Sequence, residues 1–153
     1  MVPQSKGSST YSTPPNNCQP ISCSWDQVSS PNCKCAYPYR GTLVFKAPSF
    51  SDLGDSSYYI KLQASLMNFF QSQKLPVYSV SLSNPMKDSY EYLEISLQVF
   101  PSGQDCFNQT EISRIGFMLS RQFFQPPPAF GPFNFMPGHV PYDYYVGKLE
   151  FTF

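Results

Sequence analysis

The sequence predicts an α+β domain in which an antiparallel sheet carries two helices on one face, preceded by a loop segment linked by disulfides. Stretches of alternating apolar residues and stretches of helical periodicity follow one another in the order strand, helix, strand, strand, helix, strand. Four cysteines precede this pattern within eighteen residues: Cys18, Cys23, Cys33 and Cys35. The aromatic fraction of 17% and the 16 prolines favour strands and rigid loops over long helices.

The first half of the pattern is a strand, a helix and a strand. Leu43, Phe45 and Ala47 alternate with Thr42, Val44 and Lys46, which predicts a half-buried strand over residues 42–47, ended by Pro48. Turn and capping residues at 51–56 then begin an amphipathic helix that runs to about residue 73. After Pro76, the apolar residues Tyr78, Val80 and Leu82 alternate with serines, which predicts a second strand over residues 78–82.

The second half begins with the clearest strand, residues 93–99, where every second residue is aliphatic. Asn108 is placed to cap a second helix, with Glu111 three residues later as in a capping box. The expected buried stripe of that helix is Ile112, Ile115, Gly116, Leu119 and Phe123. Gly116 predicts a close approach of the helix to the sheet.

Residues 130–135 predict a fourth strand at a sheet edge, where prolines are tolerated. The resulting order is the split βαβ arrangement of ferredoxin-like and SEA-like domains. We therefore expect a flexible linker at residues 1–17, a cysteine-rich segment at 18–41, the α+β domain at 42–135 and a divergent tail at 136–153. Residues 144–151 in that tail have the pattern of one further strand.

Charge and hydropathy restrict the class of protein. Ten acidic and ten basic residues give a net charge of zero, which argues against nucleic-acid binding. No stretch reaches the roughly 20 apolar residues of a membrane span, and the first fifteen residues lack the features of a signal peptide. Disulfides nevertheless need an oxidising compartment. We favour a piece of a larger exported protein; expression as given, without a signal peptide, would be cytoplasmic.

Several pieces of the chain resemble one family, the membrane-proximal extracellular region of plant leucine-rich-repeat receptor-like kinases of subfamily VIII. The pieces lie at residues 11–18, 33–43, 47–53, 100–101, 107–110, 115–117 and 126–132. The resemblance covers residues 11 to 135 in order and spacing. It implies a segment between the leucine-rich repeats and a transmembrane helix. The repeats and the kinase motifs are not in this sequence, so kinase activity is not implied.

The resemblance implies a non-catalytic extracellular module for interaction or sensing, with a protein or receptor ectodomain as partner. The alternative is a truncated stand-alone protein that binds a partner or the parent receptor as a decoy or regulator. No cofactor is expected. His139 is the single histidine and stands far from the cysteines in sequence, which gives a Cys-His nucleophile pair little support. We therefore do not expect an enzyme.

The four clustered cysteines allow three interpretations. As structural staples they would form two disulfides, in one of three pairings. As redox sensors they would exchange readily, above all through a strained bridge between Cys33 and Cys35; the family's link to extracellular oxidants and quinones fits this hypothesis. As thiolates they would form a Cys₄ zinc site in the cytosol. Cys106 is expected to be a free thiol, and Trp25 is expected to cover the cross-linked loop.

Asn108-Gln109-Thr110 is an N-glycosylation sequon at the start of the second predicted helix. A glycan on the amide nitrogen of Asn108 would leave the carbonyl oxygen free to cap that helix. The sequence therefore predicts a glycoprotein in which one residue has both roles.

Overall fold

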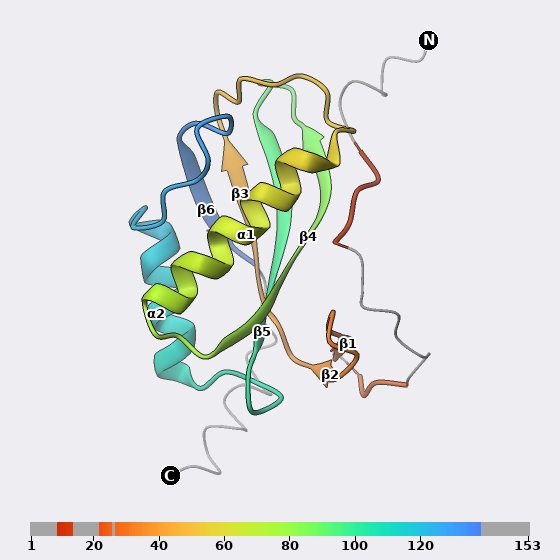
Figure 1. Ribbon diagram of the computed structural model, residues 1–153, viewed down its shortest axis with the longest axis vertical. Helices are drawn as coiled ribbons and strands as arrows, with labels where there is room; N and C mark the ends of the chain where they lie inside the picture. Colours follow the sequence, from red (N-terminus) through yellow and green to blue (C-terminus); the bar gives the residue numbers. More distant parts are fainter. Residues whose placement is uncertain (1–8, 14–21, 26, 139–153) are drawn as a thin grey trace.

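The computed structural model describes residues 9–13, 22–25 and 27–138. Its elements follow the chain in this order: β1 (Val28–Ser29), β2 (Cys35–Ala36), β3 (Tyr39–Phe45), α1 (Ser56–Ser72), β4 (Val77–Lys87), β5 (Leu93–Pro101), α2 (Gln109–Ser120) and β6 (Phe133–Pro137). The short strands β1 and β2 form a separate hairpin, and the other four strands form one sheet. Figure 1 shows α1 lying across this sheet and the hairpin beyond its end.

The four-stranded sheet has the order β4-β5-β3-β6, and every neighbouring pair is antiparallel. Helix α1 therefore joins two parallel strands, β3 and β4, that are separated by β5. Helix α2 joins β5 and β6, which are separated by β3. Two interleaved split βαβ units result. The predicted α+β fold with an antiparallel sheet is confirmed, whereas the likeness to ferredoxin-like or SEA-like domains stays a prediction.

One face of the sheet packs against both helices. On β5, the predicted aliphatic face is confirmed, because Leu93, Ile95, Leu97 and Val99 are all at most 1% exposed. These side chains belong to a single core cluster that also holds residues of α1 and α2. The side chains between them on β5 are half-buried. The opposite face of the sheet is therefore the more accessible one.

Gly116 brings α2 close to the sheet, as predicted. A Cβ atom built on Gly116 would lie 2.8 Å from the hydroxyl oxygen of Tyr39 on β3. That separation is too short for a real contact, so the absence of a side chain allows this approach. The Tyr39 side chain is itself only 4% exposed.

Both helices begin at a side-chain cap. The Asp55 carboxylate accepts from the hydroxyl and the backbone N–H of Ser57, and these hydrogen bonds hold the pKa of Asp55 below its usual value. The capping box of α2 is confirmed: Asn108 Oδ1 accepts from the Glu111 N–H at 2.8 Å, and the Glu111 carboxylate accepts from the Asn108 N–H at 2.9 Å.

Burial dominates the environment of Tyr59 on α1. Its hydroxyl donates to the Leu53 carbonyl at 2.6 Å, and the residue is fully buried. Desolvation, with a smaller contribution from the charges of Asp52 and Asp55, raises the pKa of the Tyr59 hydroxyl above its ordinary value. This hydroxyl therefore stays protonated in the folded chain.

Several element boundaries differ from the prediction, among them that of β4, which runs to Lys87 and not only to residue 82. The first strand runs over residues 39–45 and leaves Ala47 exposed. Helix α2 ends at Ser120, Gln122 takes a left-handed backbone with φ of 62°, and Phe123 is 54% exposed instead of buried. The fourth strand starts at Phe133, because Phe130 lies in a turn where its N–H donates to the Pro127 carbonyl. Phe130 is fully buried in this turn, so its apolar side chain resembled part of a strand in the sequence.

Part of the predicted linker is attached to the domain. Residues 9–13 run along the outer edge of β4, where Ser12 and Ser83 form an antiparallel bridge (Figure 1). The Thr13 N–H donates to the Leu82 carbonyl at 2.9 Å, and the Leu82 N–H donates to the Thr13 hydroxyl at 2.8 Å. Polar side chains do not prevent such pairing, since a sheet edge offers unpaired backbone groups to any extended segment.

The expected strand at 144–151 and His139 lie outside the described residues. Within the described residues, no helix has the length and apolar character needed to cross a membrane.

Candidate functional site

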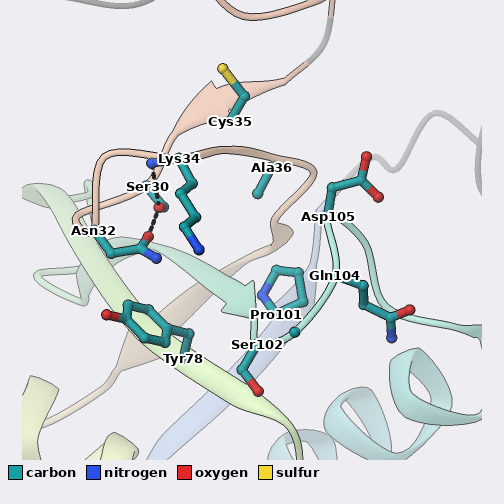
Figure 2. A pocket seen from close by; sticks show the side chains of 11 residues that line it. Ser30, Asn32, Lys34, Cys35, Ala36, Tyr78, Pro101, Ser102, Gln104 and Asp105 are labelled. Carbon is teal, nitrogen blue, oxygen red and sulfur yellow. Dashed lines mark hydrogen bonds between the residues drawn. The ribbon is translucent and has the colours of Figure 1, made fainter. Parts of the chain in front are cut away.

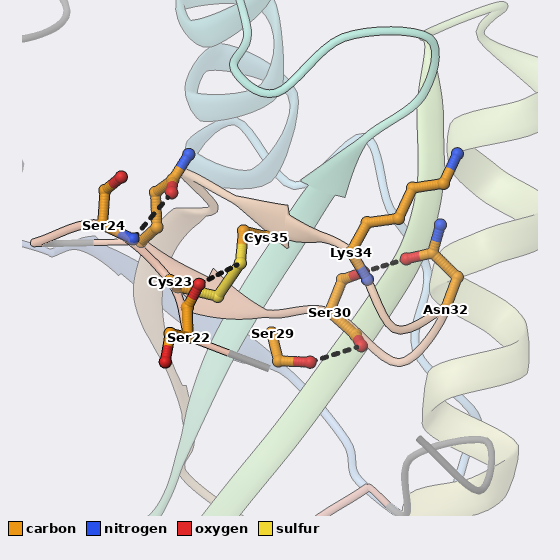
Figure 3. Close-up of a disulfide and its surroundings, with 9 residues drawn as sticks. Ser22, Cys23, Ser24, Ser29, Ser30, Asn32, Lys34 and Cys35 are labelled. Atoms are coloured by element: carbon orange, nitrogen blue, oxygen red, sulfur yellow. Dashed lines mark hydrogen bonds between the residues drawn. A yellow bond between two sulfur atoms is a disulfide. The ribbon is translucent and has the colours of Figure 1, made fainter. Parts of the chain in front are cut away.

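A disulfide closes the hairpin that precedes the sheet. Strand β1 pairs with β2 through Val28 opposite Ala36 and Ser29 opposite Cys35. Cys23 is bonded to Cys35, twelve residues later, with a Cα–Cα distance of 5.4 Å (Figure 3). Two strands of two residues bury too little surface to hold themselves together. The disulfide therefore holds together a segment that the burial of apolar surface alone would not keep folded.

The turn of the hairpin is organised around Ser30, which is only 2% exposed. Its N–H donates to the Lys34 carbonyl at 2.8 Å, and the Cys33 N–H donates to the Ser30 carbonyl at 2.9 Å. The Lys34 N–H donates weakly, at 3.4 Å, to the Ser30 hydroxyl oxygen, so the hydroxyl proton is left to donate to Asn32 Oδ1. This network orients the Asn32 side chain (Figure 3).

The other cysteines divide into bonded and free. Cys33 is also in a disulfide, and its partner lies outside the described residues. Cys18 lies outside the described residues too. The strained Cys33–Cys35 bridge that we considered is wrong, because Cys35 is bonded to Cys23. The zinc hypothesis is wrong for the same reason, since a sulfur in a disulfide is not a thiolate. The described residues contain no group of three or more metal-binding side chains.

Cys106 forms no disulfide and is 8% exposed. It lies in the loop between β5 and α2, next to the fully buried Phe107. The preceding residue, Asp105, ties this loop to the cysteine-rich segment, since its carbonyl accepts from the Tyr37 N–H at 2.7 Å. The burial of Cys106 restricts access of reagents to its sulfur.

Trp25 does not cover the cross-linked loop, contrary to our expectation. Its side chain is 82% exposed. It lies in a turn where the Gln27 N–H donates to the Ser24 carbonyl at 3.0 Å, and the Ser24 N–H donates to the Gln27 side chain. The disulfide and these turn contacts hold the loop, so no large apolar side chain is needed as a lid.

A cleft of about 410 Å³ separates the hairpin from the end of the sheet (Figure 2). The hairpin wall contains Ser30, Asn32 and Lys34. The sheet wall contains Tyr78 of β4 and the end of β5 with its loop, residues 101–105. This volume is in the range of small-molecule sites.

A bulge explains why Tyr78 faces the cleft. Val77 pairs with Pro101 and Ser79 pairs with Phe100, so β4 carries one extra residue at this point. A bulged residue is free to turn away from the regular alternation of the strand. Tyr78 is accordingly 51% exposed, although Val80 and Leu82, two and four residues later on the strand, are fully buried.

Asn108 is exposed at the start of α2, and its described hydrogen bonds use Oδ1 and the backbone N–H. The side-chain amide nitrogen, to which a glycan would be attached, makes no hydrogen bond among them. The geometry therefore allows glycosylation and capping by the same residue.

The structure thus brings Cys23 and Cys35 together and places Cys106 and Asn108 elsewhere, on the loop before α2. Sequence reasoning missed the cleft residues Asn32, Lys34 and Tyr78. The hairpin and Tyr78 are more than forty positions apart, and a bulge leaves no periodic signal, so nothing in the sequence could have paired them.

No protein-family model matches the chain, and no solved structure matches it. A search of curated proteins finds a probable leucine-rich repeat receptor-like protein kinase of Arabidopsis thaliana, which is 40% identical over 115 residues. The alignment covers 74% of this chain and 12% of the length of that relative. The chain is therefore related, through a small part of the longer protein, to the leucine-rich-repeat receptor-like kinases.

Proposed function

We propose that the chain is a non-catalytic extracellular module of a plant receptor-like kinase of subfamily VIII, used for interaction or sensing close to the membrane. The observation that carries the proposal is a disulfide-closed hairpin on an α+β domain, within a chain 40% identical to a receptor-like kinase. Structural disulfides are rare in the cytosol and common outside the cell. Kinase activity is not carried over, because the alignment covers 12% of the relative.

The exposed sequon at Asn108 supports an extracellular location. Glycosylation requires passage through the secretory pathway and an accessible asparagine. Asn108 is exposed, and its capping contacts leave the amide nitrogen available. We propose that this asparagine carries a glycan.

Oxidant sensing through the cysteines is the finer part of the proposal, with Cys18, Cys23, Cys33 and Cys35 as the sensing residues. Cys23 and Cys35 are half-buried, so small reagents have access to their sulfurs. A disulfide is already oxidised, so sensing requires that a thiol first reduce it and that the oxidant then restore it. The hairpin would change its order between the two states, since little besides the bond holds it.

Mass spectrometry of the protein secreted from plant cells tests this proposal. We expect one thiol, that of Cys106, to react with an alkylating agent in unfolded, unreduced protein, and five to react after reduction. Peptide mapping should recover Cys23 linked to Cys35. Five free thiols in protein from its native compartment would exclude the staple, and five thiols that stay free after treatment with an oxidant would exclude the sensor as well. Titration against a thiol–disulfide buffer separates the two, because a staple resists mild reduction and a sensor does not.

A stand-alone regulator or decoy that is related to the receptor-like kinase over this region is the second candidate. Such a protein would bind a partner or the parent receptor without transmitting a signal itself. A complete transcript that encodes only these residues would favour the decoy. A reading frame that adds an export signal and a membrane span would favour the receptor module.

A further inference from the structure

We infer that the cleft between the hairpin and the sheet binds a small aromatic carboxylate. The inference concerns the chain itself and holds whether or not it forms part of a receptor. It depends on a positive end and an aromatic wall, which the structure brings together from distant parts of the chain.

The positive end is Lys34. Its side chain is exposed and forms no ion pair with another described residue. Figure 2 shows the Lys34 ammonium group beside the amide of Asn32, both extending from the hairpin toward Tyr78. An ammonium and an amide N–H₂ on one side of a cleft are two donors for the two oxygens of a carboxylate.

The buried Ser30 determines which end of the Asn32 amide points into the cleft. Because its hydroxyl donates to Asn32 Oδ1, that oxygen is directed at the hairpin backbone. The nitrogen is then left on the side of Lys34, as Figure 2 shows. Ser30 is therefore a positioning residue, and the hairpin wall presents donors to the ligand.

The aromatic wall is Tyr78, with Pro101 beside it. The bulge in β4 turns the Tyr78 ring out of the core, so the ring is half-exposed, and it stacks on no other ring of the described residues. Figure 2 shows this ring and the Pro101 ring on the side of the cleft opposite Lys34. A flat ligand ring packed there would bury apolar surface on both partners.

Lys34 decides the orientation of the ligand. Figure 2 shows the Asp105 carboxylate on the far side of Pro101, directed away from Lys34. A ligand carboxylate is attracted to the Lys34 end of the cleft, which selects one binding direction.

Calorimetric titration of the full chain with 2-naphthoate, and with 2-naphthamide as the uncharged control, tests the inference. We expect naphthoate to bind with a millimolar or lower dissociation constant and the amide to bind at least about tenfold more weakly. Lys34→Gln should weaken naphthoate binding at least about tenfold. Lys61→Gln removes the same charge from an exposed position on α1 and should leave the affinity unchanged.

Tyr78→Ser tests the aromatic wall. This substitution should weaken the binding of naphthoate and leave the binding of acetate, which has no ring, unaffected. Circular dichroism of each variant confirms that it is folded. Equal affinity for the acid and the amide, equal loss in the two lysine variants, or no heat at millimolar naphthoate would each overturn the inference.

Discussion

Replacing both Cys23 and Cys35 by serine should release the hairpin and leave the α+β domain intact. The core cluster begins at Tyr39 and includes no residue of β1 or β2. The hairpin buries Ser30 and Ala36 and little else. Its order therefore depends on the disulfide, whereas the sheet and its helices do not depend on the hairpin.

The magnitude follows from the length of the loop that the bond closes. Cys23 and Cys35 are twelve residues apart. Closing a loop of this size stabilises the ordered state by about 3 kcal/mol, according to the chain-entropy estimate. Losing that contribution should speed hydrogen exchange of the protected hairpin amides about a hundredfold. The bridge of Cys33 remains and limits how far the segment moves.

Hydrogen exchange with mass spectrometry measures this effect peptide by peptide. We expect faster exchange over residues 28–36, unchanged exchange in β5, and a thermal midpoint of the domain equal to that of the wild type. Cys106→Ala is the control, because it removes a sulfur that forms no disulfide. Equal acceleration in β5 would refute the reasoning by showing that the hairpin and the sheet unfold together. Unchanged exchange in the hairpin would show that other contacts suffice.

Three further predictions concern the domain. Gly116→Ala should lower the free energy of unfolding by about 1 kcal/mol, since the new Cβ meets the Tyr39 hydroxyl. In a Tyr39→Phe background, Gly116→Ala should instead raise that free energy by about 1 kcal/mol, because the hydroxyl is gone. Chemical denaturation of the wild type, the two single variants and the double variant measures both effects. If Gly116→Ala changed the free energy of unfolding in the same direction in both backgrounds, the contact with Tyr39 would be contradicted. Thr110→Ala should remove the glycan mass and spare the cap, whereas Asn108→Ala should remove the glycan and cost about 1 kcal/mol as well; a glycan that survives Thr110→Ala would exclude the sequon. Because the pKa of Tyr59 is raised, its contribution to stability is full below about pH 10 and declines as pH rises further. Tyr59→Phe should reduce this loss of stability at alkaline pH, measured by denaturation at several pH values. If the free energy of unfolding fell equally steeply with pH in the variant and the wild type, Tyr59 would not be the group responsible.

Local patterns were enough to predict the two helices and the four strands of the sheet, but not the short strands β1 and β2. The alternation in β5 and the capping box at Asn108 each depend on residues within a few positions of one another. The same holds for Gly116, whose place on the buried stripe of a helix indicated a close approach. Boundaries were harder, because Phe130 is buried in a turn and Phe123 follows a left-handed residue that ends α2.

The cleft could not be predicted, because its walls meet only after the chain has folded. Lys34 comes from the hairpin, Tyr78 from a bulge in β4, and Asp105 from the loop after β5. The sequence analysis selected Cys33 and Cys35 as candidate site residues and not Lys34, which lies between them. The sequence also did not predict that Ser30 orients the Asn32 amide, since a serine in a polar segment is ordinarily exposed.

The sequence by itself determined the class of fold, the order of the two helices and the four strands of the sheet, the N-terminal cap of α2 and a disulfide-bearing segment before the sheet. These features depend on periodicity and on short-range hydrogen bonding, which a linear chain displays directly. Only the tertiary structure decided that Cys23 is bonded to Cys35, that Trp25 is exposed and that residues 9–13 lie along β4. Each of these depends on which distant groups meet and how much surface they bury, and chain spacing does not specify that.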